Sequence, residues 1–244
     1  MTGRIDLLGI GIDLYDTDEA YIETCKALAR ESLSLVYLVD TKACMEVVDS
    51  ESLTRVLETA DIVLPADEST ESGVINILGH TKGRVFVDDY FDRIFATIEE
   101  ESREIFIITD TEEQLNRALT TINIQRQYLS IRGDSVENIG VEQYELIANV
   151  INSVAPDVLI LCVSHKMQAE FLASYRTQIN VNLCICTGRT LLDMLYSRAE
   201  MPSFIKKFRL ENIYSWFSNK KKIHTTVSDS IFKKRIKKEK NKKI

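Results

Sequence analysis

The fold is decided by the stretch Ala155-Pro156-Asp157-Val158-Leu159-Ile160-Leu161-Cys162-Val163. Its last six residues are all apolar, a pattern typical of a strand that is covered on both faces of a sheet. The polar loop that follows opens a stretch with helical spacing, which predicts a helix over Lys166–Tyr175. A buried strand over Asp157–Val163 that leads directly into a helix indicates an α/β fold with a parallel sheet.

The same alternation of apolar runs and helical stretches extends from Ile5 to Phe217. It predicts a Rossmann-like α/β fold, in which helices flank a mostly parallel sheet. The other expected strands are Ile5–Leu8, Leu33–Val39, Asp61–Leu64, Ile105–Thr109, Tyr128–Ile131 and Val181–Cys186. The other expected helices are Asp18–Arg30, Thr41–Val48, Glu51–Thr59, Glu68–Leu78, Asp88–Glu99, Glu112–Thr120, Val141–Ser153, Arg189–Tyr196 and Ser203–Phe217. Two helix starts, Asp16 with Glu19 and Thr109 with Glu112, have the spacing of a capping box.

Charge divides the chain into two parts. From Lys220 to Ile244 there are eleven Lys and Arg residues against two acidic ones, a net charge of +9. Because the whole chain carries −7, the remainder carries −16. Together with the change in composition after Phe217, this predicts an α/β domain over residues 1–217 and a basic tail over 218–244 that is flexible or membrane-associating.

Composition and motifs exclude several classes of protein. The longest apolar runs are far shorter than the roughly 18–20 residues that a membrane-spanning helix needs, and the first residues are unlike a signal peptide. We therefore expect a cytoplasmic protein. The five cysteines include no CxxC pair, and there is no HExxH, Walker loop or GxGxxG. We accordingly expect no metal site and no bound cofactor.

Several loops carry the motifs of a known family. Ile5–Asp13 resembles its first strand and turn, and Arg84-Val85-Phe86-Val87-Asp88-Asp89 resembles its Arg-Val-x-Gly-x-Asp motif. The block from Ala155 to Phe171 is similar to its strand followed by Gly-x-Gly-x-Pro-x-Gln-Glu, of which Gln168 is kept. With further likeness in the last blocks, Gly188-Arg189 and Leu210–Tyr214, the chain resembles the WecG/TagA/CpsF glycosyltransferases over residues 4–217.

The resemblance implies a substrate class. Members of this family pass a sugar from a UDP donor to a lipid-pyrophosphate-linked acceptor at the bacterial membrane. We therefore expect transfer of a hexosamine in the assembly of a surface polysaccharide or a teichoic-acid-type polymer. The alternative is a catalytically inactive homologue that binds or regulates a partner glycosyltransferase, and a basic-tailed scaffold without any sugar site is a third reading.

One loop departs from the family at the catalytic position. The family carries Pro-Asp-Gly where this chain has Pro65-Ala66-Asp67, so Ala66, which cannot take a proton, stands at the catalytic carboxylate. Sugar transfer needs a group that accepts the proton of the acceptor hydroxyl. The candidate catalytic residues are Asp67, one position further on, and Asp40, which stands where the family has Asn.

Five residues are candidates for binding the substrate. The resemblance implies that Arg84, Gln168 and Gly188 are kept: a guanidinium can bind phosphate through paired N–H donors, and an amide can read a sugar or uracil edge. His165 and Arg189 bring side chains into loops where the family has small residues. Either they fill the pyrophosphate pocket, or they hold phosphate by charge, and the sequence leaves both readings open.

The basic tail predicts a partner. Lysine runs are often solvated extensions, but Lys and Arg near an anionic bilayer each contribute about 1 kcal/mol of binding. Since the family's C-terminal segment meets the membrane, we expect peripheral attachment to the inner face of the cell membrane. No aromatic residues interleave the charges that follow Phe232, so no nucleic acid is expected, while a second copy of the chain or a partner glycosyltransferase stays open. The candidate membrane-binding residues are Lys233, Lys234, Arg235, Lys237 and Lys238.

Overall fold

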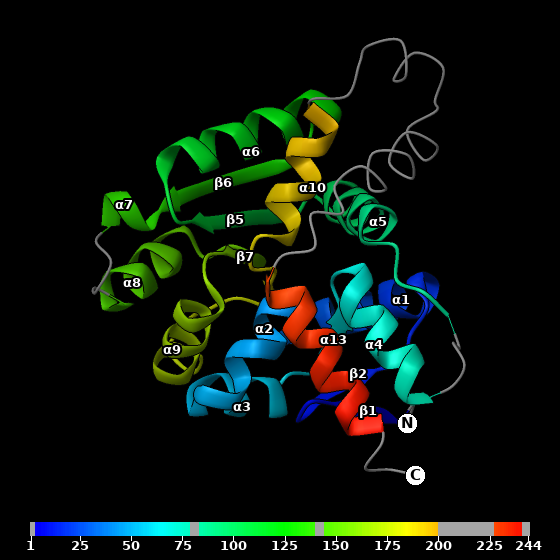
Figure 1. Ribbon diagram of the computed structural model, residues 1–244. Helices are drawn as coiled ribbons and strands as arrows, with labels where there is room; N and C mark the ends of the chain where they lie inside the picture. Colours follow the sequence, from blue (N-terminus) through cyan, green and yellow to red (C-terminus); the bar gives the residue numbers. More distant parts are fainter. Residues whose placement is uncertain (1–2, 79–82, 140–143, 200–226, 241–244) are drawn as a thin grey trace.

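A six-stranded sheet forms the centre of the protein, in a computed structural model that describes residues 3–78, 83–139, 144–199 and 227–240 (Figure 1). The strand order is β4-β3-β8-β7-β5-β6, and every pairing in it is parallel. The predicted α/β fold with a parallel sheet is confirmed. The strands are β3 (Ser34–Val39), β4 (Ile62–Pro65), β5 (Glu104–Thr109), β6 (Ser130–Ser135), β7 (Val158–Cys162) and β8 (Leu183–Cys186).

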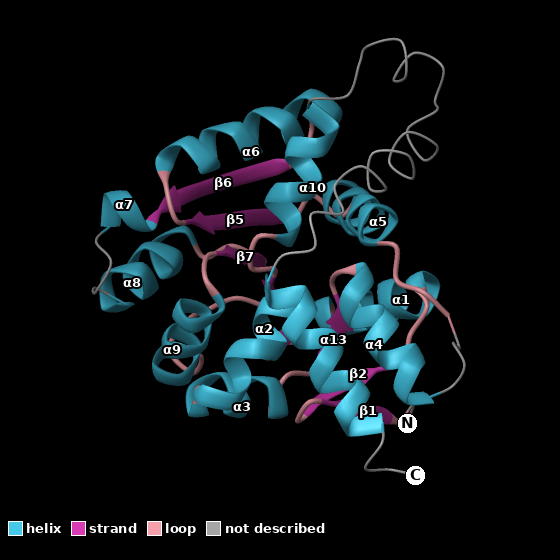
Figure 2. Cartoon of the chain, in the orientation of Figure 1, coloured by secondary structure: helices cyan, strands magenta, loops and turns pink. Residues whose placement is uncertain are grey.

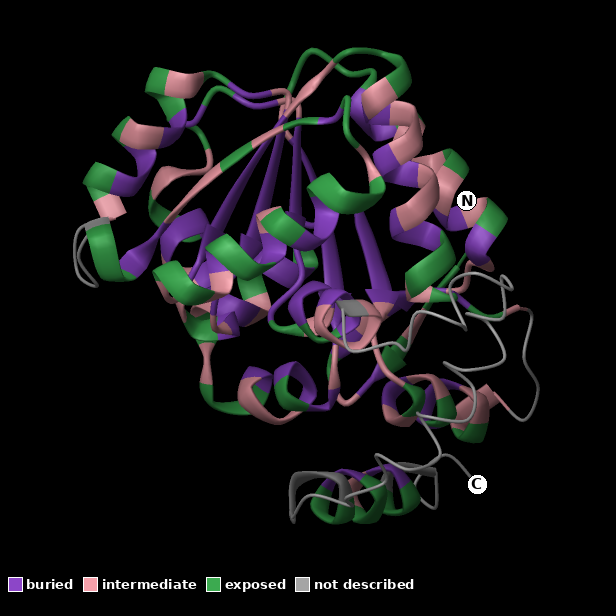
Figure 3. Cartoon of the chain, turned by 90° about the horizontal axis from the view of Figure 1, so that it is seen from above, coloured by how far each residue is buried: buried purple, intermediate pink, exposed green. Residues whose placement is uncertain are grey.

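Helices cover both faces of this sheet, as Figures 1 and 2 show. Side chains alternate along each strand, so that β3 sends Tyr37 to one core and Val36 to the other. The first core is closed by α2 (Thr41–Glu46), η1 (Val47–Asp49), α3 (Glu51–Glu58), α4 (Glu68–Leu78), α8 (Tyr144–Val154) and α9 (His165–Tyr175). The second is closed by α1 (Thr17–Leu28), α5 (Val87–Glu100), α6 (Glu112–Gln125) and α10 (Thr190–Ala199). Figure 3 shows the strands buried between these two layers.

The loops at the carboxyl ends of the neighbouring strands β5 and β7 lead to opposite faces of the sheet. After β5 the chain passes to α6 on one face, and after the neighbouring β7 it passes to α9 on the other. A change of face between neighbouring strands is the place where open parallel sheets usually bind ligands. The carboxyl edge, with the loops after β3, β4, β5, β7 and β8, is therefore where a site is to be sought.

The N-terminal strand does not belong to this sheet. The sequence predicts a strand over Ile5–Leu8 followed by a turn and a helix, but β1 (Arg4–Leu7) and β2 (Ile10–Asp13) form a separate antiparallel hairpin. Its two-residue turn holds Leu8 at φ 57° and Gly9 at φ 90°. The Asp13 carboxylate accepts a hydrogen bond of 2.7 Å from the N–H of Val63, which ties the hairpin to the edge strand β4.

Several predicted boundaries are shifted. The edge strand β6 begins two residues later than predicted and continues to Ser135. The capping box predicted for Asp16 and Glu19 is present, whereas the second box is formed by Thr111 and Gln114, not by Thr109 and Glu112. The predicted helix over 141–153 begins outside the described residues and appears as α8, preceded by the short α7 (Val136–Ile139). The predicted helix over 203–217 lies wholly outside the described residues.

The basic end of the chain packs on the body. Residues Val227–Lys240 form α13, which lies against α4 and α2. Its Phe232 and Ile236 are 1% and 5% exposed and join the first core. Gly73 of α4 makes room for them, because a Cβ there would lie 3.1 Å from Phe232 Cζ and 3.4 Å from Ile236 Cδ1. The predicted domain boundary after Phe217 lies outside the described residues and stays a prediction.

Candidate active site

The register of two strands places Asp40 beside Ala66. In the pair β3–β4 Val39 lies opposite Pro65, and the N–H of Ala66 donates to the carbonyl of Val39 at 2.8 Å. The next residues, Asp40 and Ala66, therefore follow neighbouring strand ends at the carboxyl edge. Strands in a sheet are about 4.8 Å apart. Ala66 packs against the second core, whereas the Asp40 carboxylate lies with His165 and Tyr37 on the side of the first core, so the two residues share the edge but face different sides of the sheet.

Asp40 is held by a side chain from a distant part of the sequence. Its Oδ1 accepts a hydrogen bond of 2.8 Å from the N–H of Ala43, which makes it the N-cap of α2. The same atom lies 2.9 Å from Nε2 of His165, the first residue of α9. On the other side of the ring, His165 Nδ1 lies 3.0 Å from the hydroxyl of Tyr37 in β3. Tyr37 and His165 are buried, and Asp40 is half-buried at the edge.

These contacts fix the direction of the hydrogen bonds. An ionised carboxylate only accepts, so Nε2 of His165 carries the proton of the bond to Asp40. Nδ1 is then left to accept from the hydroxyl of Tyr37. Burial alone would raise the pKa of Asp40, but the hydrogen bonds from His165 and Ala43, with the nearby Lys42 ammonium, outweigh it and lower that pKa. Burial raises the pKa of Tyr37 well above its ordinary value, which keeps the phenol a donor.

Asp67 is engaged in structure. Its Oδ2 accepts from the N–H of Thr41 at 2.8 Å and from the Thr41 hydroxyl at 3.0 Å. Its Oδ1 accepts from the N–H of Thr70 at 2.7 Å, at the start of α4. Both oxygens are therefore used to join the loop after β4 to the first turns of α2 and α4. The structure brings Asp67 to the same edge as Asp40, but with its carboxylate already bound.

Gln168 is buried under the edge and does not line it. Its side-chain amide donates to the carbonyls of Val163 at 2.7 Å and Leu161 at 3.2 Å, which close the end of β7. The residue is 0% exposed, and its Oε1 has no hydrogen-bond partner among the described residues. Turning the amide over would set this oxygen against two carbonyls, so the orientation is fixed. The match to the family at Gln168 thus marks a support of the loop.

Arg84 lies apart from the Asp40 cluster. Its Nε is 2.9 Å from the carboxylate of Glu71 on α4, and its guanidinium carbon stands 5.1 Å from the ring centroid of Phe86. The Arg84 side chain is half exposed, whereas Glu71 is mostly covered. Burial raises the pKa of Glu71, and Arg84 opposes the rise. Both residues line a small cavity of about 30 Å³ that also touches Pro65, the residue before Ala66.

Gly188 and His165 are packed against each other. Gly188 has φ +54°, and a Cβ on it would lie 2.8 Å from Cε1 of His165. Glycine is required there on both grounds. The next residue, Arg189, is exposed and lies near Asp110, which follows β5. Burial raises the pKa of Asp110, and the charges of Arg189 and Lys42 only oppose this rise. The carboxyl edge therefore carries two cations, Arg189 and Lys42, near the carboxylate of Asp110.

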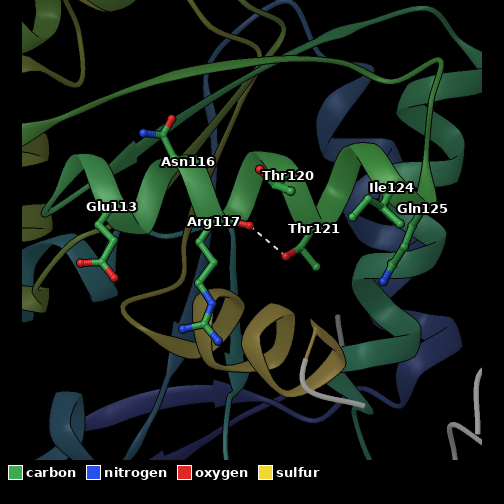
Figure 4. A pocket seen from close by; sticks show the side chains of 7 residues that line it. All are labelled: Glu113, Asn116, Arg117, Thr120, Thr121, Ile124 and Gln125. Carbon is green, nitrogen blue, oxygen red and sulfur yellow. Dashed lines mark hydrogen bonds between the residues drawn. The ribbon is translucent and has the colours of Figure 1, made fainter. Parts of the chain in front are cut away.

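A larger cavity than the one beside Arg84 lies elsewhere in the described part of the chain. It measures about 560 Å³ and runs along α6, as Figure 4 shows. Its lining residues all come from that helix and include no pair suited to proton transfer: Glu113, Asn116, Arg117, Thr120, Thr121, Ile124 and Gln125. Within the described ranges no three His, Cys, Asp or Glu side chains gather as a metal site. We therefore centre the candidate site on the carboxyl edge.

Sequence reasoning found some of these residues and missed others. The structure brings Asp40, Asp67, His165 and Gly188 to one edge, with Arg189 beside them. It leaves Arg84 at the neighbouring cavity and Gln168 in the core. Tyr37, Glu71 and Asp110 were missed. Asp110 alone carried a signal, because it directly follows a predicted apolar strand.

The basic residues named for membrane binding lie on α13. Lys233, Lys234, Lys237 and Lys238 are exposed, and Arg235 is half-buried. Because Phe232 and Ile236 face α4, the lysines occupy the outer side of the helix. No helix in the described ranges has an apolar stretch long enough to span a bilayer.

Comparison with known proteins gives one match. Residues 5–242 match the glycosyl transferase WecG/TagA/CpsF family, so the match includes the basic helix α13 as well as the body. A search of curated proteins found no match. Since nearly the whole chain is covered, with its parallel sheet and carboxyl-edge site, the chain belongs to the WecG/TagA/CpsF family of glycosyl transferases.

Proposed function

We propose that the chain transfers a hexosamine from a UDP-sugar to a lipid-pyrophosphate-linked acceptor, in the assembly of a bacterial surface polysaccharide or a teichoic-acid-type polymer. The family match over residues 5–242 carries this proposal. The position of polar and charged side chains at the carboxyl edge of a parallel sheet supports it, since nucleotides commonly bind there.

Cations at the edge would receive the pyrophosphate. Arg84 uses Nε for Glu71, and its half-exposed guanidinium has two further nitrogens that could donate to phosphate oxygens. Arg189 supplies a second exposed guanidinium at the other end of the edge. His165 adds no charge contact to a ligand in this scheme, because it is buried between Tyr37 and Asp40.

The acceptor would come from the membrane. Four exposed lysines on α13 form a positive surface that an anionic bilayer attracts, at about 1 kcal/mol for each charge near the surface. With α13 packed on α2 and α4, this surface is fixed relative to the loops after β3 and β4. The protein would then act on the inner face of the cell membrane, where the lipid-linked sugar is held.

A specific observation also favours the alternative, a catalytically inactive homologue that binds or regulates a partner glycosyltransferase. Ala66 lacks the carboxylate of the family, and Asp67 has both oxygens engaged. Such a protein would bind UDP or the lipid-linked sugar without turnover, whereas a scaffold without a sugar site would bind neither.

Calorimetric titration with UDP and UDP-hexosamines tests the proposal. We expect binding by the wild type, and a loss of roughly 1.5–3 kcal/mol in Arg84→Ala, the scale of a charge-assisted hydrogen bond. Arg55→Ala is the matched control, because Arg55 also pairs with one glutamate, Glu51, but on exposed α3. Absence of UDP binding by the wild type would contradict both the enzyme and the inactive homologue that binds a nucleotide-sugar.

A further inference from the structure

The carboxylate of Asp40 lies at the same edge of the sheet as Ala66, on the side of the first core. Ala66 and Asp40 follow strands β4 and β3, whose register sets Val39 opposite Pro65. The two positions are thus adjacent on the same edge, about one strand spacing apart. The sequence places both residues after predicted strands, and the structure shows that these strands are neighbours although α2, η1 and α3 separate them along the chain.

The carboxylate of Asp40 is oriented with one oxygen available. Oδ1 receives the N–H of Ala43 and Nε2 of His165, while no hydrogen bond to Oδ2 exists among the described residues. Its side chain is 21% exposed, so this second oxygen meets the solvent at the edge. Asp67 differs, because its two oxygens are occupied by Thr41 and Thr70.

Two buried polar groups serve this one carboxylate. His165 is 2% exposed and Tyr37 is 0% exposed, and a polar side chain is costly to bury unless it is hydrogen-bonded. The hydroxyl of Tyr37 lies 3.0 Å from Nδ1 of His165, and Nε2 of His165 lies 2.9 Å from Oδ1 of Asp40. The two hydrogen bonds thus form a series that ends on Asp40. The rings are also stacked, with centroids 5.8 Å apart. Gly188 adds the space that the imidazole needs.

We propose that Asp40 is the proton acceptor of the sugar transfer, and that His165 and Tyr37 are positioning residues that hold its carboxylate ionised and turned to the edge. This inference rests on the proposed function. It moves the acceptor from the strand end of β4 to the strand end of β3. It also separates the roles of the two aspartates, since Asp67 holds the loop and Asp40 receives the proton.

The hydroxyl oxygen of the acceptor sugar forms a bond to C1 of the donor hexosamine, and the bond between C1 and the oxygen of the β-phosphate breaks. The electron pair of that bond leaves with UDP. The hydroxyl proton passes to Oδ2 of Asp40, which becomes neutral and later returns the proton to water. His165 keeps its proton on Nε2 throughout, so it only stabilises the carboxylate.

A carboxylate with a low basicity suits this step. The attacking hydroxyl becomes acidic as its oxygen bonds to C1, so a weak base accepts the proton late in the reaction. Among the described residues, the titratable groups that interact with Asp40 are Lys42 and Cys44 on α2, Tyr37 on β3 and His165 on α9. Asp67, before α4, also acts on Cys44.

The test is a UDP-release assay with lipid-linked acceptor on the full chain, over a range of pH. Asp40→Asn should lower kcat by about 10²–10⁴-fold, the usual loss of a general base, with KM for the UDP-sugar within about threefold. Tyr37→Phe removes only a hydroxyl and should lower kcat by about three- to tenfold. Because the hydrogen bond from His165 to Asp40 is then weaker, the acidic limb of the profile of kcat against pH should move to higher pH. Asp67→Asn should lower kcat less than Asp40→Asn does.

Folding and activity are separated by a second measurement on the same samples. Thermal unfolding and UDP titration of each variant report the folded, binding-competent fraction to which kcat is scaled. Asp40→Asn within threefold of wild type, a larger loss in Asp67→Asn, or an unmoved pH profile in Tyr37→Phe would each overturn the inference and leave the proposed function standing. A wild type that binds UDP but releases none from any UDP-hexosamine would overturn the proposed transfer, and the inference with it.

Discussion

At the scale of single residues, Asp40 combines a structural role with a chemical one. It caps α2 through the N–H of Ala43, and it receives the hydrogen bond from His165. A cap such as Ser50 at α3 has only the first of these contacts. The caps Asp40 and Ser50 look alike in the sequence. Only the fold shows that Asp40 also has a buried partner, His165.

Asp40→Ala should lower the free energy of unfolding by more than Ser50→Ala, which is expected to cost about 1 kcal/mol as the loss of an N-cap. The pKa of Asp40 is lowered in the folded state. The ionised carboxylate therefore makes its full contribution to the free energy of unfolding above the pKa of the unfolded state, about 3.9. This contribution is lost as the pH falls through the pKa of the folded state. Urea unfolding at pH 7 and below pH 4 measures this. A gap between Asp40→Ala and wild type that does not shrink in acid would contradict the assigned contacts.

At Gln168 the motif match and the observed contacts indicate different roles. The resemblance implies a ligand contact, but the structure buries the amide on the carbonyls at the end of β7. Gln168→Ala should lower the free energy of unfolding by about 2 kcal/mol, since it leaves a buried carbonyl without its donor. UDP affinity of the folded variant should stay unchanged. Denaturant unfolding and calorimetry check both parts, and a stable variant with weakened UDP binding would return Gln168 to the ligand site.

At the scale of elements, the buried strands were predicted with nearly correct bounds, whereas the bounds of the exposed edge strand β6 and the pairing of β1 were not. The apolar run in β7 needs no context, because it is covered on both faces. The edge strand β6 contains Arg132-Gly133-Asp134, which reads as a turn. The hairpin turn at Leu8-Gly9 lacks the Asn-Gly or Asp-Gly signal of such turns, and Leu8 accepts a positive φ that its residue type disfavours.

The docking of α13 also depended on a contact that no local pattern reveals. Phe232 fits against α4 only because residue 73 is glycine. The pairing of Asp40 with His165 is of the same kind, since the two residues are brought together from opposite halves of the chain. Thus periodicity predicted the elements of the carboxyl edge, while the partners within the site required the fold.

Phe232→Ala should release α13 from the body. Phe→Ala at a buried site costs about 3–5 kcal/mol, and here the loss falls on the attachment of one helix. Ile231→Ala is the matched control, because Ile231 is 41% exposed and its replacement should cost less than about 0.5 kcal/mol. Hydrogen–deuterium exchange of residues 230–238 should become faster in Phe232→Ala alone. Equal exchange in the two variants would show that Phe232 does not anchor the helix.

At the scale of the whole molecule, negative and positive charge are separated. The chain carries −7 overall, yet α13 presents a row of lysines on its outer side. Because Phe232 and Ile236 belong to the core, removing this helix would also expose apolar surface of α4. Membrane binding is therefore better tested by charge changes in the full chain than by truncation.

A variant with Lys233, Lys234, Lys237 and Lys238 all changed to Gln should keep its fold and lose sedimentation with anionic liposomes. The four charges together are worth about 4 kcal/mol before screening, and raised salt should release the wild type in the same way. Lys26→Gln with Lys166→Gln, two exposed lysines of other helices, serves as the control. Unchanged liposome binding in the four-lysine variant would move the membrane contact to another surface.

The central claim is that a nucleotide-sugar binds at the carboxyl edge around Asp40. Hydrogen–deuterium exchange of the full chain with and without UDP tests it most directly. We predict slower exchange in the loops after β3, β4, β7 and β8, within residues 40–46, 66–72, 163–168 and 187–192. Exchange along α6, beside the larger cavity, should stay unchanged. Protection confined to residues 113–125, or no protection at saturating UDP, would contradict the account.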